Sequence, residues 1–372
     1  MSAMPGPKVC YFNNPRYTGD FHGYQISTLD PAPYFFQGTR WRLSARLKFR
    51  ALFNAAGLDT LYRERDPAYM RYVRDFVAAY HDADILVMAT YNPIHPEILY
   101  RELAAPTKIL GFIDDPYSTY VRGIPYLWAF DGAFYISPAY NDAHRFAEAL
   151  RAWGCEAAYW FPLVVSEHPP AQPTDSFFRD RDVDVVYVGG GYGPKIDRLR
   201  HLKSRLGARL RVHGRWRFRG HVGWMRGLLG KPVFPYRVAP LSDGERRELY
   251  FRTKIGINMH LSETPTESGN MRMYEVPAHG AMLLCDKGAL NAHELIFKPG
   301  VEAVFYDDVT DALERIEYYL AHTEERLAIA RAGFERAQSD YGAHATLKGM
   351  LDWASHIQRR PRPLPSATRN GE

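Results

Sequence analysis

Short apolar segments alternate with amphipathic segments along most of this chain, and this alternation restricts the folds that are open to it. The apolar segments of the first half have the length of buried strands, and the amphipathic ones carry apolar side chains at helical spacing. The predicted strands are 8–12, 83–90, 107–115 and 131–137, and the predicted helices are 40–57, 96–105 and 139–154. Strands that alternate with helices predict a parallel sheet with helices on both faces.

The same alternation starts again after a polar, proline-rich segment at 166–182, which we interpret as a linker. The second half has predicted strands at 183–190, 208–214, 254–260 and 281–286, and predicted helices at 194–207, 242–253 and 311–338. A chain of 372 residues has room for two such domains. We expect domains at 1–165 and 183–340, a helix at 341–358 that packs back on the first domain, and a flexible tail at 359–372. The fold class is therefore α/β, with two Rossmann-like, doubly wound domains facing a central cleft.

Charge and cysteine content exclude several classes of protein. The net charge is only +5, so the molecule as a whole is not a polyanion binder. Its three cysteines are scattered and match neither a disulfide framework nor a zinc site, and we expect no metal. Neither a secretory signal nor an apolar stretch of the roughly 18 residues needed for a spanning helix is visible, which favours a cytoplasmic protein. The oligomeric state is not indicated.

The segment 263–286, ETPTESGNMRMYEVPAHGAMLLCD, is the strongest candidate for a ligand site. Gly269 and Asn270 stand where a loop turns into a helix, and free N–H groups at a helix start attract phosphate. Arg272 adds a fixed positive charge, while Glu275 can accept hydrogen bonds from a diol such as that of ribose. Glu267 can approach the same ligand from the loop. The alternative is a capped surface helix whose acidic residues complement its dipole.

The glycine-rich segment 187–195, YVGGGYGPK, is the second candidate, because glycine lets a ligand approach the backbone. Gly189, Gly190 and Gly191, with Tyr192 and Lys195, are predicted to line the ligand site. The spacing is not that of the dinucleotide motif, and no acidic residue ends the following strand. A nicotinamide-dependent oxidoreductase is therefore the third choice of function.

The remaining candidates are weaker. Asp114 and Asp115 end a predicted strand, where one could act as a base or cap the turn before Pro116. His22 lies in a glycine-bounded loop that could belong to the first domain's side of the cleft. Asp182 and Asp184 form a D-x-D sequence, but they lead into a strand and a metal role is disfavoured.

A cluster of arginines and aromatic residues at 213–237, with Arg215 near its start, suits an anionic or lipid-linked ligand. It contains no nucleic-acid motif, so we expect no nucleic-acid partner. Peripheral contact with a membrane surface stays open.

The wider text from KIGINMH at 254–260 to the helical segment ending at 338 resembles the CgeB-like glycosyltransferases, and Glu267 to Glu275 matches the E-x7-E spacing of retaining enzymes with the GT-B fold. The similarity covers roughly 180–350. It implies that Glu275 binds the ribose of a nucleotide sugar and Glu267 the hydroxyls of the sugar. It also implies that the backbone of Gly269 to Met271, with Arg272, holds the diphosphate without a metal.

Residues and resemblance together predict a glycosyltransferase that is retaining and metal-independent. Its donor would be a nucleotide sugar, with no further cofactor, and its acceptor a glycan, a lipid-linked molecule or a small molecule. The alternative from another class is a protein of the same fold that binds a nucleotide sugar or glycan without transferring it.

Overall fold

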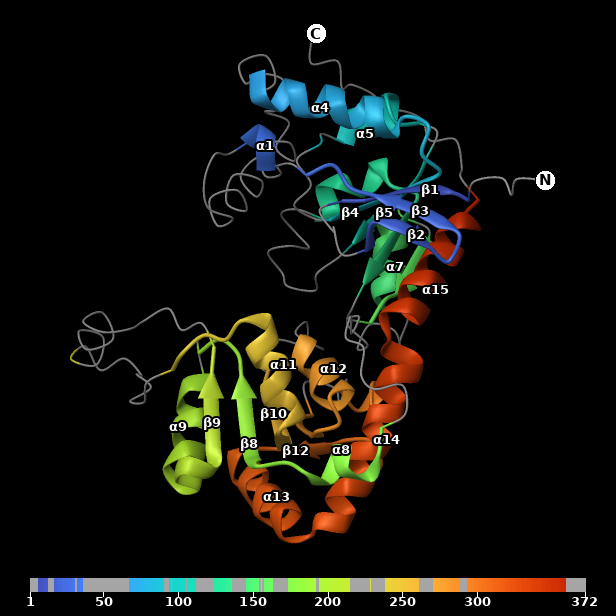
Figure 1. Cartoon of the computed structure of the whole chain (residues 1–372). Coiled ribbons are helices and arrows are strands. Elements are labelled where there is room, and N and C mark those ends of the chain that lie inside the picture. Colours follow the sequence, from blue (N-terminus) through green and yellow to red (C-terminus); the bar gives the residue numbers. More distant parts are fainter. Residues whose placement is uncertain are drawn as a thin grey trace. The chain divides into compact units, whose positions relative to one another are not determined.

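The chain divides into two compact units, and we describe each by itself (Figure 1). The first comprises Met1–Tyr135, His144–Tyr159 and Lys348–Glu372, and the second comprises Ile136–Ala143 and Trp160–Leu347. The computed structural model describes residues 6–12, 17–30, 32–35, 67–89, 94, 96–104, 106–111, 123–135, 145–153, 155, 157–162, 173–191, 194–214, 228, 238–260, 270–287 and 293–358.

The first unit is built on a seven-stranded sheet with the order β2-β3-β1-β4-β5-β6-β7. Its strands are β1 (Lys8–Tyr11), β2 (Gly19–Phe21), β3 (Tyr24–Ser27), β4 (Ile85–Ala89), β5 (Thr107–Gly111), β6 (Gly132–Tyr135) and β7 (Ala157–Trp160). Strands β3, β1, β4, β5 and β6 run parallel, whereas β2 pairs antiparallel with β3 in a hairpin. The helices are α1 (Ala32–Phe35), α4 (Pro67–Tyr80), α5 (Pro96–Arg101), η3 (Ile124–Ala129) and α7 (Arg145–Ala152).

The C-terminal helix α15 (Ala343–Ser355) contributes its second half to this first unit. The ring of Trp353 stacks on Tyr159 of β7 with centroids 5.1 Å apart, and Tyr24 donates a hydrogen bond of 2.7 Å to Asp352. A Cβ atom on Gly132 would lie 2.9 Å from Trp353, so the helix lies directly against β6. The sheet of the first unit is therefore packed against helices from both the N-terminal and the C-terminal parts of the chain.

The second unit contains a five-stranded, fully parallel sheet with the order β12-β11-β10-β8-β9. Its strands are β8 (Val183–Val188), β9 (Leu210–His213), β10 (Thr253–Asn258), β11 (Met282–Asp286) and β12 (Val304–Tyr306). The chain moves from β8 outward to β9 and then returns to the other side of β8 to form β10. The strand order therefore reverses between β8 and β10, which are neighbours in the sheet.

Helices cover both faces of this sheet (Figure 1). They are α8 (Asp175–Arg179), α9 (Lys195–Leu206), η4 (Gly207–Arg209), α11 (Asp243–Phe251), α12 (Met271–Ala278), α13 (Val309–Ala321) and α14 (Thr323–Tyr341). Successive residues of a strand point to opposite faces: Val185 and Tyr187 pack with α9 and α13, whereas Val186 between them packs with α11 and α12. Because both faces are buried, the strands at the centre of the sheet are mainly apolar, as in other parallel sheets.

The expectation of two mainly parallel α/β sheets is confirmed, but two local predictions need correction. The helix predicted at 311–338 is interrupted at His322, which has ψ 73° and whose Nδ1 bonds the carbonyl oxygen of Tyr318 at 2.8 Å. This bond caps α13 and ends it. The segment predicted as a linker is folded in its second part, because α8 buries Phe178 in the core of the second unit. The helix predicted at 40–57 lies outside the described residues.

Among the described residues, no helix has both the length and the apolar content that a membrane span requires.

Candidate functional site

The candidate site lies where the carboxyl ends of β8 and β10 meet in the second unit. In open α/β sheets, ligands bind outside the carboxyl ends of the strands, at the point where the strand order reverses. Here that edge is formed by Gly189 to Gly191 after β8, and by Met259 and His260 after β10. Helix α12 begins at the same edge with Asn270 as its N-cap residue.

Asn270 starts α12 because its side-chain Oδ1 accepts a hydrogen bond of 3.1 Å from the backbone N–H of Arg272. The predicted transition from loop to helix is therefore present. The helix is only 8 residues long and carries Pro277 in its last turn. Met271 is 39% exposed at its first position. Glu267 and Gly269 lie outside the described residues.

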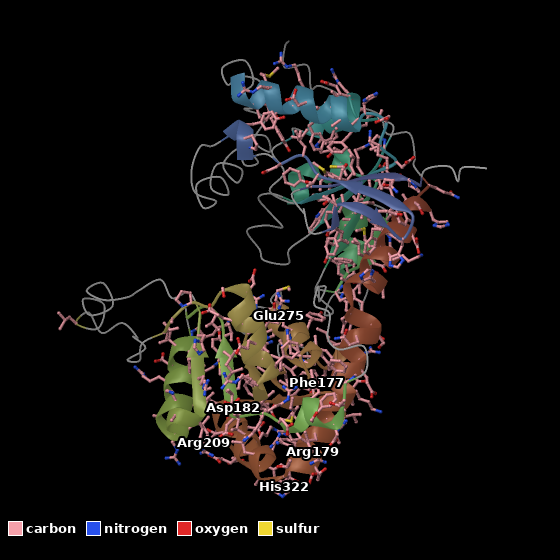
Figure 2. The ribbon with its side chains drawn as sticks, in the orientation of Figure 1. Phe177, Arg179, Asp182, Arg209, Glu275 and His322 are labelled. Carbon is pink, nitrogen blue, oxygen red and sulfur yellow. The ribbon has the colours of Figure 1, made fainter. Side chains whose placement is uncertain are left out.

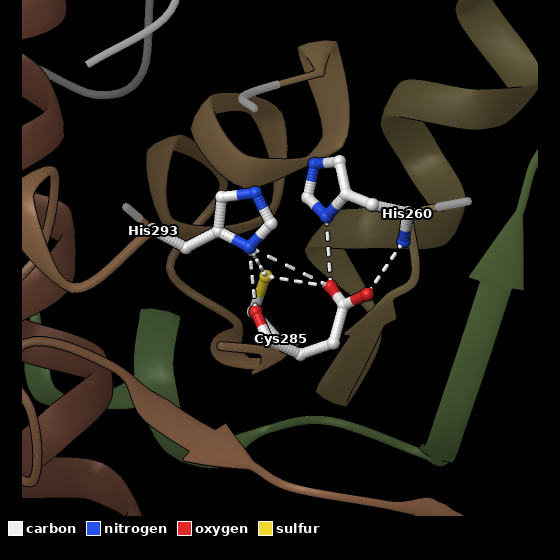
Figure 3. A group of neighbouring side chains, drawn as sticks. His260, Cys285 and His293 are labelled. Carbon is white, nitrogen blue, oxygen red and sulfur yellow. Dashed lines mark hydrogen bonds and ion pairs between the residues drawn. The ribbon is translucent and has the colours of Figure 1, made fainter. Parts of the chain in front are cut away.

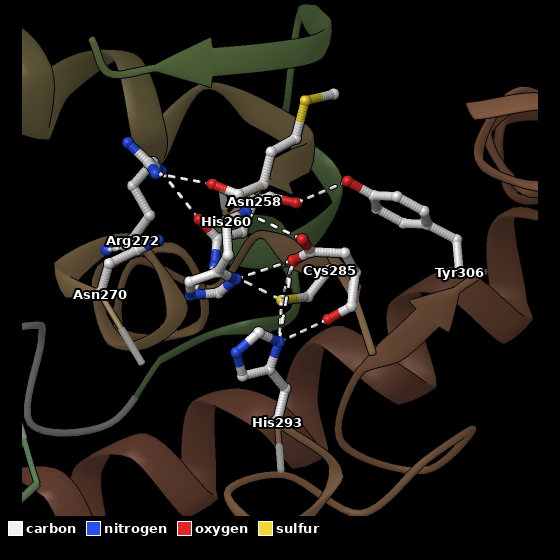
Figure 4. A network of polar contacts seen from close by, with 9 residues as sticks. Asn258, His260, Asn270, Arg272, Cys285, His293 and Tyr306 are labelled. Atoms are coloured by element: carbon white, nitrogen blue, oxygen red, sulfur yellow. Dashed lines mark hydrogen bonds and ion pairs between the residues drawn. The ribbon is translucent and has the colours of Figure 1, made fainter. Parts of the chain in front are cut away.

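The guanidinium of Arg272 joins the ends of the two central strands (Figure 4). Its Nε donates to Oδ1 of Asn258 at 2.8 Å, Nη1 to the carbonyl oxygen of Val188 at 3.0 Å, and Nη2 to that of Met259 at 3.1 Å. Its Cζ lies 5.0 Å from the ring centroid of Tyr187. These three acceptors are uncharged, so the bonds orient the guanidinium without neutralising its charge.

The glycine-rich segment makes room for this side chain. A Cβ atom on Gly189 would lie 2.0 Å from Nη1 of Arg272, so a larger residue at this position would displace the guanidinium. The hydroxyl of Tyr187 donates to the carbonyl oxygen of Gly190 at 3.2 Å and shapes the turn after β8. Lys195 is 1% exposed at the start of α9, and Tyr192 lies outside the described residues.

Glu275 lies one turn further along α12 and is 6% exposed (Figure 2). Its Oε1 lies 3.2 Å from Nη2 of Arg246 on α11, and Arg246 also pairs with Asp243. A carboxylate has about four lone-pair sites, so one arginine does not exhaust its capacity to accept hydrogen bonds. Arg246 was missed by the sequence analysis, because nothing in its local pattern links α11 to α12.

A buried polar cluster extends the site along the sheet edge to β11 (Figure 3). Asp286, the last residue of β11, accepts hydrogen bonds from Nδ1 of His260 at 2.7 Å and from the backbone N–H of His260 at 2.8 Å. His293 donates from Nδ1 to the carbonyl oxygen of Asp286 at 2.6 Å. The two imidazole rings lie 3.8 Å apart, and Cys285 is buried beside them.

Burial and hydrogen bonding set the protonation of this cluster. Burial lowers the pKa of His260 to about 4, although the hydrogen bond to Asp286 acts in the opposite direction. Burial alone would raise the pKa of Asp286, but the hydrogen bonds from the ring and backbone N–H of His260, together with the charge interactions of the two imidazoles, outweigh it and hold this pKa well below its ordinary range. Burial also raises the pKa of the Cys285 thiol. We therefore assign a neutral imidazole that donates to an ionised carboxylate, beside a protonated thiol.

Histidine, cysteine and aspartate are also metal ligands, and one ligand atom from each of His260, Cys285, Asp286 and His293 lies within 4.8 Å of the others. Hydrogen bonds within the cluster occupy Nδ1 of both imidazoles, so neither Nδ1 is placed as a metal ligand. A carbonyl oxygen can only accept, so Nδ1 of His293 must carry the proton, and Nδ1 of His260 carries one toward the carboxylate. A metal-bound nitrogen carries none. We interpret the group as a hydrogen-bonded cluster.

Several predicted site residues lie elsewhere or outside the described part of the chain. His22, at φ 51°, lies in the exposed turn of the β2–β3 hairpin in the first unit, and its role stays a prediction. Asp182 pairs with Arg252 and Asp184 with Lys254, so neither is placed as a metal ligand. Asp114, Asp115 and Arg215 lie outside the described residues, and their roles stay predictions.

Comparison with known proteins gives one family match, over part of the chain. A family described as "Glycosyl transferase-like" matches residues 196–352, which include α9, α11, α12 and the whole polar cluster. No curated protein matches the sequence significantly.

Solved structures resemble the chain over nearly its whole length. An α-glucosyltransferase in complex with UDP-glucose and DNA gives a TM-score of 0.60 at 11% identity, covering 94% of this chain and 99% of that one. The fold is GT-B. The HepE protein of Anabaena with UDP-glucose gives a TM-score of 0.57 at 10% identity, with coverage of 93% and 98%. Sucrose-phosphate synthase from Thermosynechococcus elongatus gives 0.56 at 11% identity, also with coverage of 93% and 98%. At such identities the likeness concerns the fold.

Proposed function

We propose that this protein is a glycosyltransferase that takes a sugar from a nucleotide-activated donor. The observation that carries the proposal is the placement of Arg272. Its guanidinium is fixed by three hydrogen bonds at the carboxyl ends of β8 and β10. That edge is where sheets of this strand order bind nucleotides, and a fixed guanidinium is suited to a diphosphate. The family match over 196–352 and the GT-B neighbours in complex with UDP-glucose support the same conclusion.

In this proposal the start of α12 and the turn after β8 hold the diphosphate. Helix N-termini bind anions through their N–H groups and dipole, and here Arg272 supplements them from the first turn. The backbone of Gly269 to Met271 and the glycines 189–191 would approach the phosphates. Charge that develops on the departing diphosphate would then be stabilised by groups already in position.

Glu275 would bind the ribose hydroxyls. Its carboxylate is buried, and Arg246 fixes Oε1 from α11. A carboxylate whose position is fixed presents its lone pairs in one geometry, which suits paired hydroxyls. Glu267 would contact the hydroxyls of the sugar, completing the E-x7-E arrangement to which the CgeB-like resemblance points.

The finer features of the reaction are also proposals. We infer retention of anomeric configuration from the E-x7-E spacing, and metal independence from the cationic groups assigned to the diphosphate. Asp114, Asp115 or His22 would act on the acceptor, which is a glycan, a lipid-linked molecule or a small molecule. A protein that binds the nucleotide sugar without transferring it is the alternative, which a transfer assay separates from an enzyme.

Calorimetric titration with UDP, ADP, GDP, TDP and their glucose conjugates tests the donor site. We expect one base to bind in the micromolar range, with affinity lowered about 10-fold or more in Arg272→Ala and Glu275→Ala. Release of diphosphate from the matching sugar nucleotide, in the presence of candidate acceptors, then tests transfer. If no nucleotide binds, the proposal is wrong. Binding without release across an acceptor panel would favour the non-catalytic alternative.

A further inference from the structure

We propose that Asn258 is a positioning residue that aims Arg272 at the diphosphate, and that the buried His260–Asp286 pair fixes the strand end from which it acts. The inference rests on the proposed function, since it assigns a role to residues around the same donor site. None of these residues belongs to the E-x7-E motif.

Asn258 is fully buried, and its polar groups are all engaged (Figure 4). Oδ1 accepts from Nε of Arg272 at 2.8 Å, while Nδ2 donates to Sγ of Cys285 at 3.4 Å and lies 3.5 Å from Nε2 of His260. Its carbonyl oxygen accepts a hydrogen bond of 2.8 Å from the hydroxyl of Tyr306. These contacts define which side of the amide faces Arg272, because the donor side is turned toward sulfur and imidazole.

The next carbonyl along the chain, that of Met259, accepts from Nη2 of Arg272 at 3.1 Å. Met259 lies between two anchored residues. Tyr306 holds the carbonyl of Asn258 on one side, and Oδ2 of Asp286 holds the N–H of His260 at 2.8 Å on the other. The same carboxylate holds the His260 ring through Oδ1. Two acceptors of Arg272, Oδ1 of Asn258 and the carbonyl oxygen of Met259, are therefore positioned by residues of β11 and β12. No hydrogen bond given for the described residues joins those residues to Arg272 itself.

The choice of an amide at position 258 has a chemical reason. An aspartate there would accept the same bond but would pair with the guanidinium and reduce the charge available to a phosphate. An apolar residue would leave Nε of Arg272 without this acceptor. Asparagine orients the cation and leaves its charge in place, which favours a preorganised phosphate site.

The test compares UDP with uridine, or the diphosphate and nucleoside of whichever base the panel identifies. Their affinity ratio isolates the contribution of the phosphates. We expect Asn258→Leu to lower the affinity for the diphosphate about 10-fold or more and to leave that for the nucleoside within about 2-fold. Thr253→Val is the matched control. It lies at the other end of β10, is equally buried, and loses a hydrogen bond of 2.6 Å to the carbonyl of Leu249. Its affinity ratio should not change.

A double-mutant cycle separates positioning from general loss of structure. If Asn258 acts through Arg272, the double variant Asn258→Leu with Arg272→Ala binds the diphosphate no more weakly than Arg272→Ala alone. Additive losses, or equal losses for nucleoside and diphosphate, would overturn the inference. If Asn258→Leu does not fold, Tyr306→Phe takes its place, with an expected decrease of about 3-fold in the same ratio.

The two proposals fail in different ways. Wild-type protein that binds no nucleotide removes the proposed function and the inference with it. Wild-type binding that depends on Arg272 but not on Asn258 leaves the proposed function intact and overturns the inference alone.

Discussion

Gly189 and Arg272 are packed so closely that a Cβ atom at position 189 would lie 2.0 Å from Nη1. The turn after β8 and the first turn of α12 are 83 positions apart in sequence, by the difference between the two residue numbers. Together they form one surface, in which the absence of a side chain on one residue permits the position of the other.

The first prediction concerns this contact. Gly189→Ala should displace the guanidinium and weaken nucleoside diphosphate binding by about 10-fold, because one well-placed hydrogen bond to a charged group contributes roughly 1.5–3 kcal/mol. Gly244→Ala is the control, since a Cβ there meets nothing within 4 Å. Calorimetry on both variants provides the measurement. Unchanged affinity in Gly189→Ala would show that Arg272 does not bind the phosphate.

The second prediction tests Glu275 as the ribose ligand. Wild-type protein should bind a nucleoside diphosphate at least about 10-fold more tightly than its 2′,3′-dideoxy analogue, because hydrogen bonds to a carboxylate are among the strong ones. Glu275→Ala should abolish the preference by weakening only the ribose form. Arg246→Leu should reduce the preference in part, since Arg246 holds Oε1. A preference that survives in Glu275→Ala would exclude the residue from ribose binding.

The third prediction concerns the stability of the second unit. Arg181 is 7% exposed, and it donates five hydrogen bonds to the carbonyl oxygens of Phe177, Phe178, Tyr250, Thr253 and His279. Arg181→Met would leave these buried oxygens without donors and should lower the free energy of unfolding by about 3–5 kcal/mol.

Arg179, the last residue of α8 and two positions before Arg181, provides the control for this variant (Figure 2). It is exposed and pairs with Asp175 and Glu324 on the surface. Exposed ion pairs contribute little, so Arg179→Met should shift a urea unfolding curve far less. Equal shifts for the two variants would show that the buried carbonyls find other donors, such as water.

The fourth prediction concerns acid stability. The pKa of His260 is lowered from 6.5 to about 4 by burial, so the imidazole is neutral in the folded protein throughout that interval and becomes protonated in the unfolded chain. The unfolded state then binds more protons, and stability must fall as the pH falls from 6.5 toward 4. The loss from this residue is about 3 kcal/mol at pH 4. It makes no contribution above pH 7.

Urea unfolding at pH 7 and pH 4.5 measures this effect. His260→Asn removes the titrating ring, and its unfolding free energy should change less between the two values of pH, even though the variant is less stable at pH 7. A wild-type slope no steeper than that of the variant would mean that the ring is protonated in the folded state.

The fifth prediction concerns metal. Because the residues of the cluster are hydrogen-bonded to one another, we expect purified protein to contain less than stoichiometric zinc. A chelator should leave the melting temperature unchanged. Zinc at one equivalent by elemental analysis, together with a lower melting temperature in the chelator, would instead identify the cluster as a metal site.

The sequence predicted the helices and strands better than the contacts between them. Alternating apolar segments identified β8, β10 and β11, since a strand buried on both faces must be apolar, and the spacing around Asn270 predicted where α12 begins. Local pattern cannot show that Arg246 on α11 meets Glu275 on α12, because the contact depends on how the two helices pack.

The polar cluster was missed for a related reason. Asp286 is the last residue of β11 and His260 lies two residues after the end of β10, and a parallel sheet brings such ends together. Strand order was needed to establish that β10 and β11 are neighbours, and nothing in a single sequence gives that order.

Helix α15 has a consequence for how the protein is made. Part of the covering of β6 and β7 comes from residues after Lys348, whereas all the described strands of the second unit lie between β8 and β12. Domains fold as the chain emerges from the ribosome. The strands of the first unit therefore leave the ribosome first, yet that unit is completed last and must wait through the synthesis of its neighbour for its final helix.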